Sequence, residues 1–111
     1  MKFEIFKSEK NEKFYFNLKA KNGQIILSSQ GYAQKSGAKN GIDSVRTNCG
    51  DDECFEIKEA ANGKVFFNLL AKNKQVIGKS QMYASKSGMQ NGIESVKTNA
   101  PDAELVDLTA A

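Results

Sequence analysis

Two nearly identical stretches decide the fold of this chain: QKSGAKNGIDSVRTNC at residues 34–49 and SKSGMQNGIESVKTNA at residues 85–100. The similarity extends beyond them, because residues 13–48 align without a gap onto residues 64–99, with 23 of 36 positions identical. Self-similarity of this length at a fixed spacing is the signature of a duplicated structural unit.

The segment that opens each unit occurs a third time at the end of the chain. FEIF near the N-terminus returns as FEIK from Phe55, and ELVDL from Glu104 matches ECFEI at the junction. We therefore expect a single domain of two tandem repeats, residues 1–51 and residues 52–111, with a C-terminal strand that closes the second repeat. The junction segment is expected to close the first repeat and to open the second.

Hydrophobic periodicity assigns the elements within each unit. Residues 14–29 alternate apolar and polar side chains on either side of Asn22-Gly23, which predicts a β-hairpin. A two-residue type I′ turn there would place Ala20 opposite Ile25. After the hairpin the apolar spacing changes from two to three or four residues, which predicts a helix. Each unit therefore reads strand, strand, strand, helix.

Glycines interrupt the helical part of each unit. Gly37 and its equivalent Gly88 are expected to let the helix lie close to the sheet, because a glycine inside a helix costs about 1 kcal/mol relative to alanine. Asn40-Gly41 and its counterpart in the second repeat are predicted to break the helix before a last turn.

Eight apolar side chains are expected to lie buried between the sheet and the helices. They are Phe16, Leu18, Ile42, Val45, Phe67, Leu69, Ile93 and Val96. Four residues separate Cys49 from Cys54, a spacing that fits neither a redox pair nor half of a zinc site. Both cysteines are expected to be reduced and buried, with Cys54 in a strand.

These motifs resemble the YegP-like family of small bacterial proteins. The resemblance rests on FYFNLKA, the asparagine turn, S-x-x-Y-x-x-K and NGI-x-SV-x-x-N, which recur in both repeats with substitutions such as Leu70 in place of Lys19. It implies an α+β fold in which tandem β-β-β-α repeats form one largely antiparallel sheet, with helices on one face and exchanged terminal strands. It implies no activity, because the function of the family is uncharacterised.

Composition narrows the classes of function. The chain contains no histidine, which excludes serine triads, Cys-His pairs and histidine metal sites. We expect no metal, no cofactor and no recognisable catalytic constellation. The net charge of +3 divides into +4 up to Asp51 and −1 beyond it, which is a weak footprint for nucleic-acid binding. No signal peptide or membrane span is evident, so a cytoplasmic protein is expected.

Two sets of residues exceed what a plain structural role requires. The first is the sheet face without helices, where the mixture of aromatic, amide and ammonium groups is typical of an interaction surface. The candidate binding surface consists of Tyr15, Asn17, Lys19, Phe66, Asn68 and Lys72, and the same predicted face includes Lys21, Ile26, Ser28, Leu70, Ile77 and Lys79.

The second set lies where each hairpin leads into its helix. Free N–H groups at a helix N-terminus attract anions, and a lysine adds a charge. The candidate anion site consists of Ser29, Lys35 and Ser36 in the first repeat and Ser80, Lys86 and Ser87 in the second, beside Tyr32 and Tyr83. Helix capping by the hydroxyls and packing by the tyrosines is the alternative interpretation.

The sequence leaves the function unknown and favours a non-catalytic binding or interaction module. One alternative is a single-stranded nucleic-acid binder, with Tyr15 and Phe66 stacking on bases and lysines following phosphates. A second alternative is an enzyme that uses lysine, serine or tyrosine. The partner is unknown, and the chain is expected to be a monomer whose two repeats form an internal pseudo-dimer.

Overall fold

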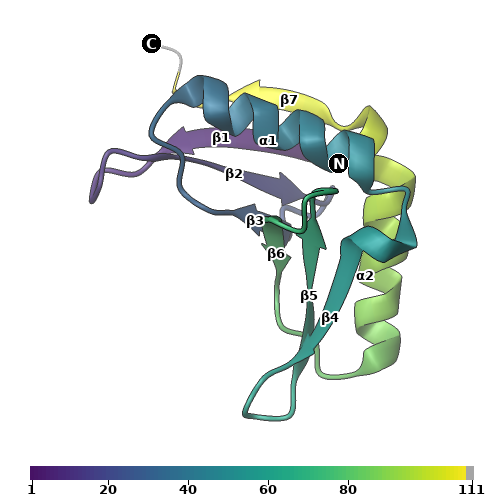
Figure 1. Cartoon of the computed structure of the whole chain (residues 1–111). Coiled ribbons are helices and arrows are strands. Elements are labelled where there is room, and N and C mark those ends of the chain that lie inside the picture. Colours follow the sequence, from purple (N-terminus) through teal and green to yellow (C-terminus); the bar gives the residue numbers. More distant parts are fainter. Residues whose placement is uncertain (110–111) are drawn as a thin grey trace.

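The structure is a computed structural model that describes residues 1–109. It repeats a strand-strand-strand-helix unit and then adds one strand, as the sequence predicts (Figure 1). Residues 110 and 111, which end the predicted second repeat, lie outside the described part. The elements are β1 (Lys2–Lys7), β2 (Phe14–Lys19), β3 (Ile25–Ser29), α1 (Lys35–Asn48), the short 3-10 helix η1 (Asp52–Cys54), β4 (Phe55–Glu59), β5 (Val65–Leu70), β6 (Val76–Ser80), α2 (Lys86–Asn99), η2 (Ala100–Asp102) and β7 (Glu104–Asp107).

All seven strands form one sheet in the order β4-β5-β6-β3-β2-β1-β7. Every neighbouring pair is antiparallel except β1 and β7, which are parallel. The two repeats meet where β3 pairs with β6, and Ser28 lies directly opposite its own equivalent, Lys79. The register therefore places a pseudo-two-fold axis at this pair. The predicted α+β fold with one largely antiparallel sheet is confirmed.

The C-terminal strand crosses to the other repeat. β7 follows α2 but pairs with β1, and the Leu108 N–H donates to the Ile5 carbonyl at an N···O distance of 2.8 Å. This confirms the exchanged terminal strand. The junction segment behaves differently from the expectation, because β4 pairs with β5 alone and so opens the second repeat without closing the first. Within residues 1–109 no strand pairs with the outer edge of β4.

The hairpin turn differs from the predicted two-residue type. The Ala20 N–H donates to the Gln24 carbonyl and the Gly23 N–H donates to the Ala20 carbonyl, so the loop has three residues and Gly23 takes a φ of +83°. Lys19 consequently faces Ile25, and the predicted pair of Ala20 with Ile25 is wrong. A bulge then restores the expected register further along the hairpin.

Both helices run without the predicted break. Gly41 and Gly92 lie inside continuous helices, and the place of their missing side chains is taken by the rings of Tyr32 and Tyr83. Each tyrosine ring is also stacked on a phenylalanine of the sheet, with centroids 6.4 Å apart for Tyr32 and Phe16 and 6.3 Å apart for Tyr83 and Phe67. The glycines therefore form a notch for a ring rather than a helix end.

The core lies between the sheet and the helices. The eight side chains predicted to be buried are all 3% exposed or less. At the pseudo-two-fold axis Leu27 fills the space beside Gly78, where a Cβ atom would come within 2.7 Å of the Leu27 Cγ. Cys49 and Cys54 are free and buried, and burial raises the pKa of both thiols. Cys54 lies in η1 rather than in a strand, which corrects its predicted position.

Candidate binding surface

The sheet has a helix-free face on the inside of a bend. Strands of the first repeat run across the view in Figure 1, those of the second run down it, and α1 and α2 lie on the outside. Strand pairing aligns one polar residue from each of six strands into a central row across this inner face. The row is Glu4, Asn17, Ser28, Lys79, Asn68 and Glu56, in the order of the strands from β1 to β4.

Hydrogen bonds connect neighbours within the central row. The Ser28 Oγ donates to the Asn17 Oδ1 at 2.9 Å, and the Asn68 Nδ2 donates to the Glu56 Oε1 at 3.1 Å. These bonds fix the amide orientations of Asn17 and Asn68, so the row presents a preformed set of donors and acceptors.

On the part of the inner face formed by the first repeat, the charged side chains form ion pairs with each other. The Lys19 Nζ lies 2.8 Å from one carboxylate oxygen of Glu4, and the Lys2 Nζ lies 3.2 Å from the other. The hydrogen bond from Lys19 is the main reason why the pKa of Glu4 is lowered below its ordinary value. Lys19 is therefore engaged with a carboxylate on the surface itself.

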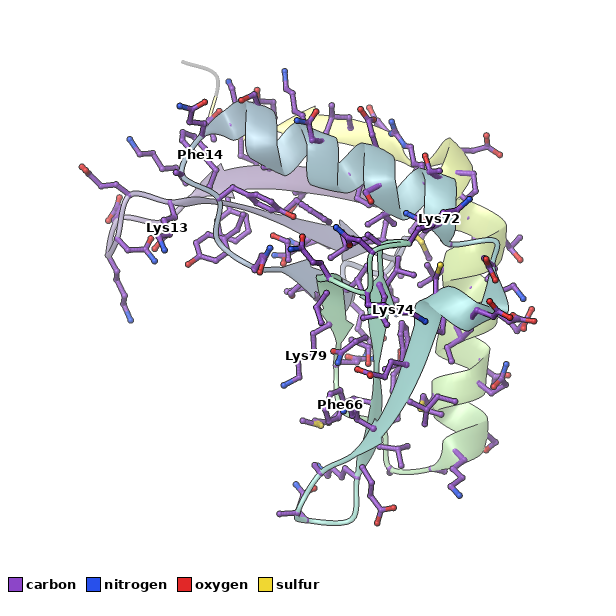
Figure 2. The ribbon with its side chains drawn as sticks, in the orientation of Figure 1. Lys13, Phe14, Phe66, Lys72, Lys74 and Lys79 are labelled. Carbon is purple, nitrogen blue, oxygen red and sulfur yellow. The ribbon has the colours of Figure 1, made fainter. Side chains whose placement is uncertain are left out.

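Lys79 is different, because it has no carboxylate within 4.0 Å among the side chains of residues 1–109. Its ammonium lies over the ring of Phe66, with Nζ 4.6 Å from the ring centroid, and both project into the inner side of the bend (Figure 2). On the other half of the face Tyr15 is stacked on Phe6 at 5.7 Å between centroids. The row is thus flanked by aromatic rings on both sides.

The inner face is hollowed beside the pseudo-two-fold axis. A shallow hollow of about 520 Å³, open to solvent, lies there. It is lined by Gly23, Ile25, Ser28, Lys79, Ser80 and Gln81. Two members of the central row, Ser28 and Lys79, therefore lie in its wall.

Ile26 and Ile77 do not belong to this face, although alternation along the strands predicts it. They are 7% and 5% exposed and lie in the core, because each is the extra residue of the bulge that follows the hairpin turn. Lys72 also lies apart from the row. It lines a separate hollow with Asp51 and Glu53. Tyr15, Asn17, Lys19, Phe66 and Asn68 do share the face, as the strand register places them.

The candidate anion site is not gathered around a common point. The Ser29 Oγ accepts from the Phe16 N–H at 2.9 Å and donates to the Gln30 carbonyl at 2.8 Å. Ser80 makes the equivalent bonds with Phe67 and Gln81. Both hydroxyls thus complete the backbone hydrogen bonding of the sheet. Ser36 and Ser87 are exposed at the helix N-termini.

The two lysines of that set differ. The Lys35 Nζ lies 2.9 Å from the Asp107 Oδ2 and 3.0 Å from the Thr109 Oγ1, so it holds the end of β7. Hydrogen bonds from Thr109 and from Lys35 hold the pKa of the Asp107 carboxyl well below its usual range. Lys86 is exposed and makes no ion pair within the described chain.

Three residues of the face were missing from the candidate set. Glu4 and Phe6 alternate with the buried Phe3 and Ile5 in β1, so the alternation of FEIF could have placed them on the open face. Glu56 follows by the repeat. Their contacts could not be read from sequence, because they depend on which strands are neighbours.

The fold and this face define a small tandem-repeat α+β protein. The chain belongs to the family described as domain of unknown function DUF1508, which matches it twice, at residues 9–56 and 60–107. The YegP-like resemblance is thereby confirmed.

Relatives of similar length share this description. A UPF0339 protein from the 5′ region of the ptx operon of Stutzerimonas stutzeri is 51% identical over 96% of this chain and 95% of its own length. The UPF0339 protein YegP of Escherichia coli K12 is 49% identical over 96% of both chains. These relatives are uncharacterised and bring no activity to the site.

Two solution structures match the fold. The UPF0339 protein of Shewanella oneidensis superposes with a TM-score of 0.90 and 47% identity, over 96% of this chain and 90% of that one. YegP of Escherichia coli, described as a protein of unknown function, superposes with a TM-score of 0.89 and 47% identity, over 96% and 91%.

Residues 1–109 contain neither a helix able to span a bilayer nor a cluster of metal ligands. Neither α1 nor α2 has the length and apolar character that a bilayer-spanning helix needs. No group of three or more histidine, cysteine, aspartate or glutamate side chains there could hold a metal ion.

Proposed function

We propose that this protein is a non-catalytic binding module that holds a small anionic ligand with a planar ring against the inner face of the sheet. The observation that carries the proposal is Lys79, an uncompensated ammonium beside the hollow at the pseudo-two-fold axis. An acidic group of the ligand would pair with Lys79, and its ring would lie near Phe66. Asn17, Ser28 and Asn68 would supply hydrogen bonds.

Single-stranded nucleic acid has less support as the ligand. The aromatic rings of Tyr15 and Phe66 suit base stacking. However, Lys19 and Lys2 are already paired with Glu4, so fewer free ammonium groups remain to follow a phosphate backbone. A lysine, serine or tyrosine enzyme also has less support, because the hydroxyls of Ser29 and Ser80 are held by backbone groups.

A thermal-shift screen of acidic ring-containing metabolites and of a short single-stranded oligonucleotide tests the proposal. We expect a metabolite to raise the melting temperature and to shift the NMR signals of Ser28 and Lys79. Lys79→Gln should weaken that binding about tenfold. Lys39→Gln changes an exposed lysine of α1, on the opposite side of the sheet, and should bind like the unmodified protein.

The Tyr15→Ala, Phe66→Ala double variant separates the two ligand classes. Loss of oligonucleotide binding with a steep salt dependence would favour the nucleic-acid alternative. Metabolite binding that is unchanged in both Lys79→Gln and the double variant would refute the inner face as the site.

A further inference from the structure

The two repeats differ at the outer edge of β4. β1 and β4 are equivalent strands, since Phe3 and Ile5 in one correspond to Phe55 and Ile57 in the other. β1 carries β7 along its outer edge, whereas β4 has a paired neighbour on its β5 side only, as far as residues 1–109 show (Figure 1). The position equivalent to that of β7 is therefore empty.

The missing strand leaves an apolar residue uncovered. Ile5 is 0% exposed beneath α1 and next to β7, while its equivalent Ile57 is 55% exposed. A large aliphatic side chain in the core-facing position of a strand is normally buried, so this exposure marks the space that a further strand would cover.

The missing strand also leaves a lysine without its acid. Lys35 at the start of α1 binds Asp107, which lies opposite Ile5 in the parallel pairing. Lys86 occupies the equivalent position at the start of α2 and contacts no carboxylate of the described chain. The same helix position is thus used in one repeat and open in the other.

Just before the N-terminal end of β4, the chain's own η1 occupies the position that an added strand would need. Arg46 donates to the Ala103 carbonyl just before β7, whereas its equivalent Lys97 is paired with Asp52 of η1. An incoming strand would therefore meet β4 from Phe55 to Glu59 and not before it.

We propose that β4 and Lys86 form a docking site for an extended segment of a partner protein, which adds to the sheet as a parallel strand. The segment would carry an apolar residue opposite Phe55 and an acidic residue opposite Ile57, as Leu105 and Asp107 do opposite β1. Backbone hydrogen bonds provide affinity in this mode of recognition, and the acid that reaches Lys86 provides specificity.

A second copy of this chain fits the site less well. Its own β7 is occupied, and in an antiparallel β4–β4 pair centred on Ile57 the residue opposite Ile57 would be isoleucine rather than an acid. The charged side chains of Glu56, Lys58 and Glu59 on this short strand are the kind that discourage edge-to-edge association.

The test uses the full chain, labelled with nitrogen-15, and a synthetic peptide AELVDLT, the sequence of residues 103–109. We expect saturable amide shifts confined to β4 and the first turn of α2. Lys86→Gln should weaken binding about tenfold, and so should a peptide that carries Asp107→Asn. Combining the two changes should cause little further loss, because they remove the same interaction.

Two further variants keep the result interpretable. Ile57→Lys changes an exposed side chain, so the protein should fold normally by circular dichroism while peptide binding is lost. Lys39→Gln should leave binding unchanged. The proposal is overturned if β4 shows no shifts at millimolar peptide, if Lys86→Gln binds equally well, or if the shifts fall on β1 because the peptide displaces β7. A concentration-dependent dimer through β4 in sedimentation velocity, without peptide, would also overturn it.

Discussion

Two tyrosines, Tyr32 and Tyr83, occupy the notches that Gly41 and Gly92 leave in the helices. A Cβ atom at Gly92 would collide with the Tyr83 hydroxyl and lie 2.8 Å from its Cζ. Protein interiors are close-packed, so such an overlap must be relieved by moving the ring or the helix. Helix propensity alone would favour alanine here, and the ring is the reason that glycine is better.

Gly92→Ala is therefore expected to lower the free energy of unfolding by about 1–3 kcal/mol, although alanine would gain about 1 kcal/mol in an unhindered helix. Tyr83→Phe alone should be close to neutral, because its buried hydroxyl has no hydrogen-bond partner within residues 1–109. Together the two changes should cost less than Gly92→Ala alone. Urea unfolding measures all three, and strictly additive effects would show that ring and helix are not in conflict.

At the scale of elements, β7 ties the second repeat to the first. It pairs with β1, the Ala103 carbonyl before it accepts from Arg46, and Asp107 binds Lys35. These contacts come from segments more than fifty residues apart, so they join the two ends of the chain.

A chain that ends at Ala103 should be much less stable than one that ends at Thr109. Without β7 the outer edge of β1 is unpaired and Ile5 loses its cover, so unfolding at lower urea concentration or association between molecules is expected. Urea unfolding with light scattering distinguishes these results. Equal midpoints for the two chains would mean that β7 adds no stability.

The Lys35–Asp107 pair should make the docking of β7 depend on pH. The pKa of Asp107 is lowered in the folded protein, so its contribution to stability is complete above the unfolded value of about 3.9 and is lost as the pH falls toward the folded pKa. Asp107→Asn should therefore unfold at lower urea concentration than the unmodified chain at pH 7, and the gap between the two midpoints should narrow steadily as the pH falls below about 4. A gap that is constant from pH 7 to pH 2 would contradict the ionic role of Asp107.

At the scale of the whole molecule, the two repeats build one core across the β3–β6 pair. A single repeat would leave β3 as an open edge, whereas the tandem chain pairs it internally. We therefore expect a monomer at micromolar concentration. Light scattering coupled to size exclusion measures this directly, and a stable dimer would contradict it.

The sequence was sufficient for those parts of the fold that the repeat displays. Matching ELVDL to ECFEI predicted a closing strand, and alternation placed Phe16 and Phe67 in the core. The three-residue turn at Gly23 and the buried Ile26 were not predicted, because a bulge shifts the strand register without leaving a distinct pattern in the amino-acid sequence.

The candidate sites were predicted less completely, for a related reason. Lys35 and Lys86 have the same neighbours in sequence, yet Lys35 is paired with a residue 72 positions away and Lys86 is not. Only the tertiary structure separates them. Tyr15, Asn17 and Phe66 could be placed on one face by alternation, whereas the pairing of Lys19 with Glu4 depends on the order of strands.

Leu27 and Gly78 occupy equivalent positions, and one fills the volume that the other vacates. A symmetric assembly of two first repeats would force leucine against leucine at the axis, and one of two second repeats would leave a void there. The two halves have thus become a complementary pair that cannot substitute for one another. This divergence makes the duplication difficult to reverse, because a single repeat that pairs with itself would require further compensating changes at the axis.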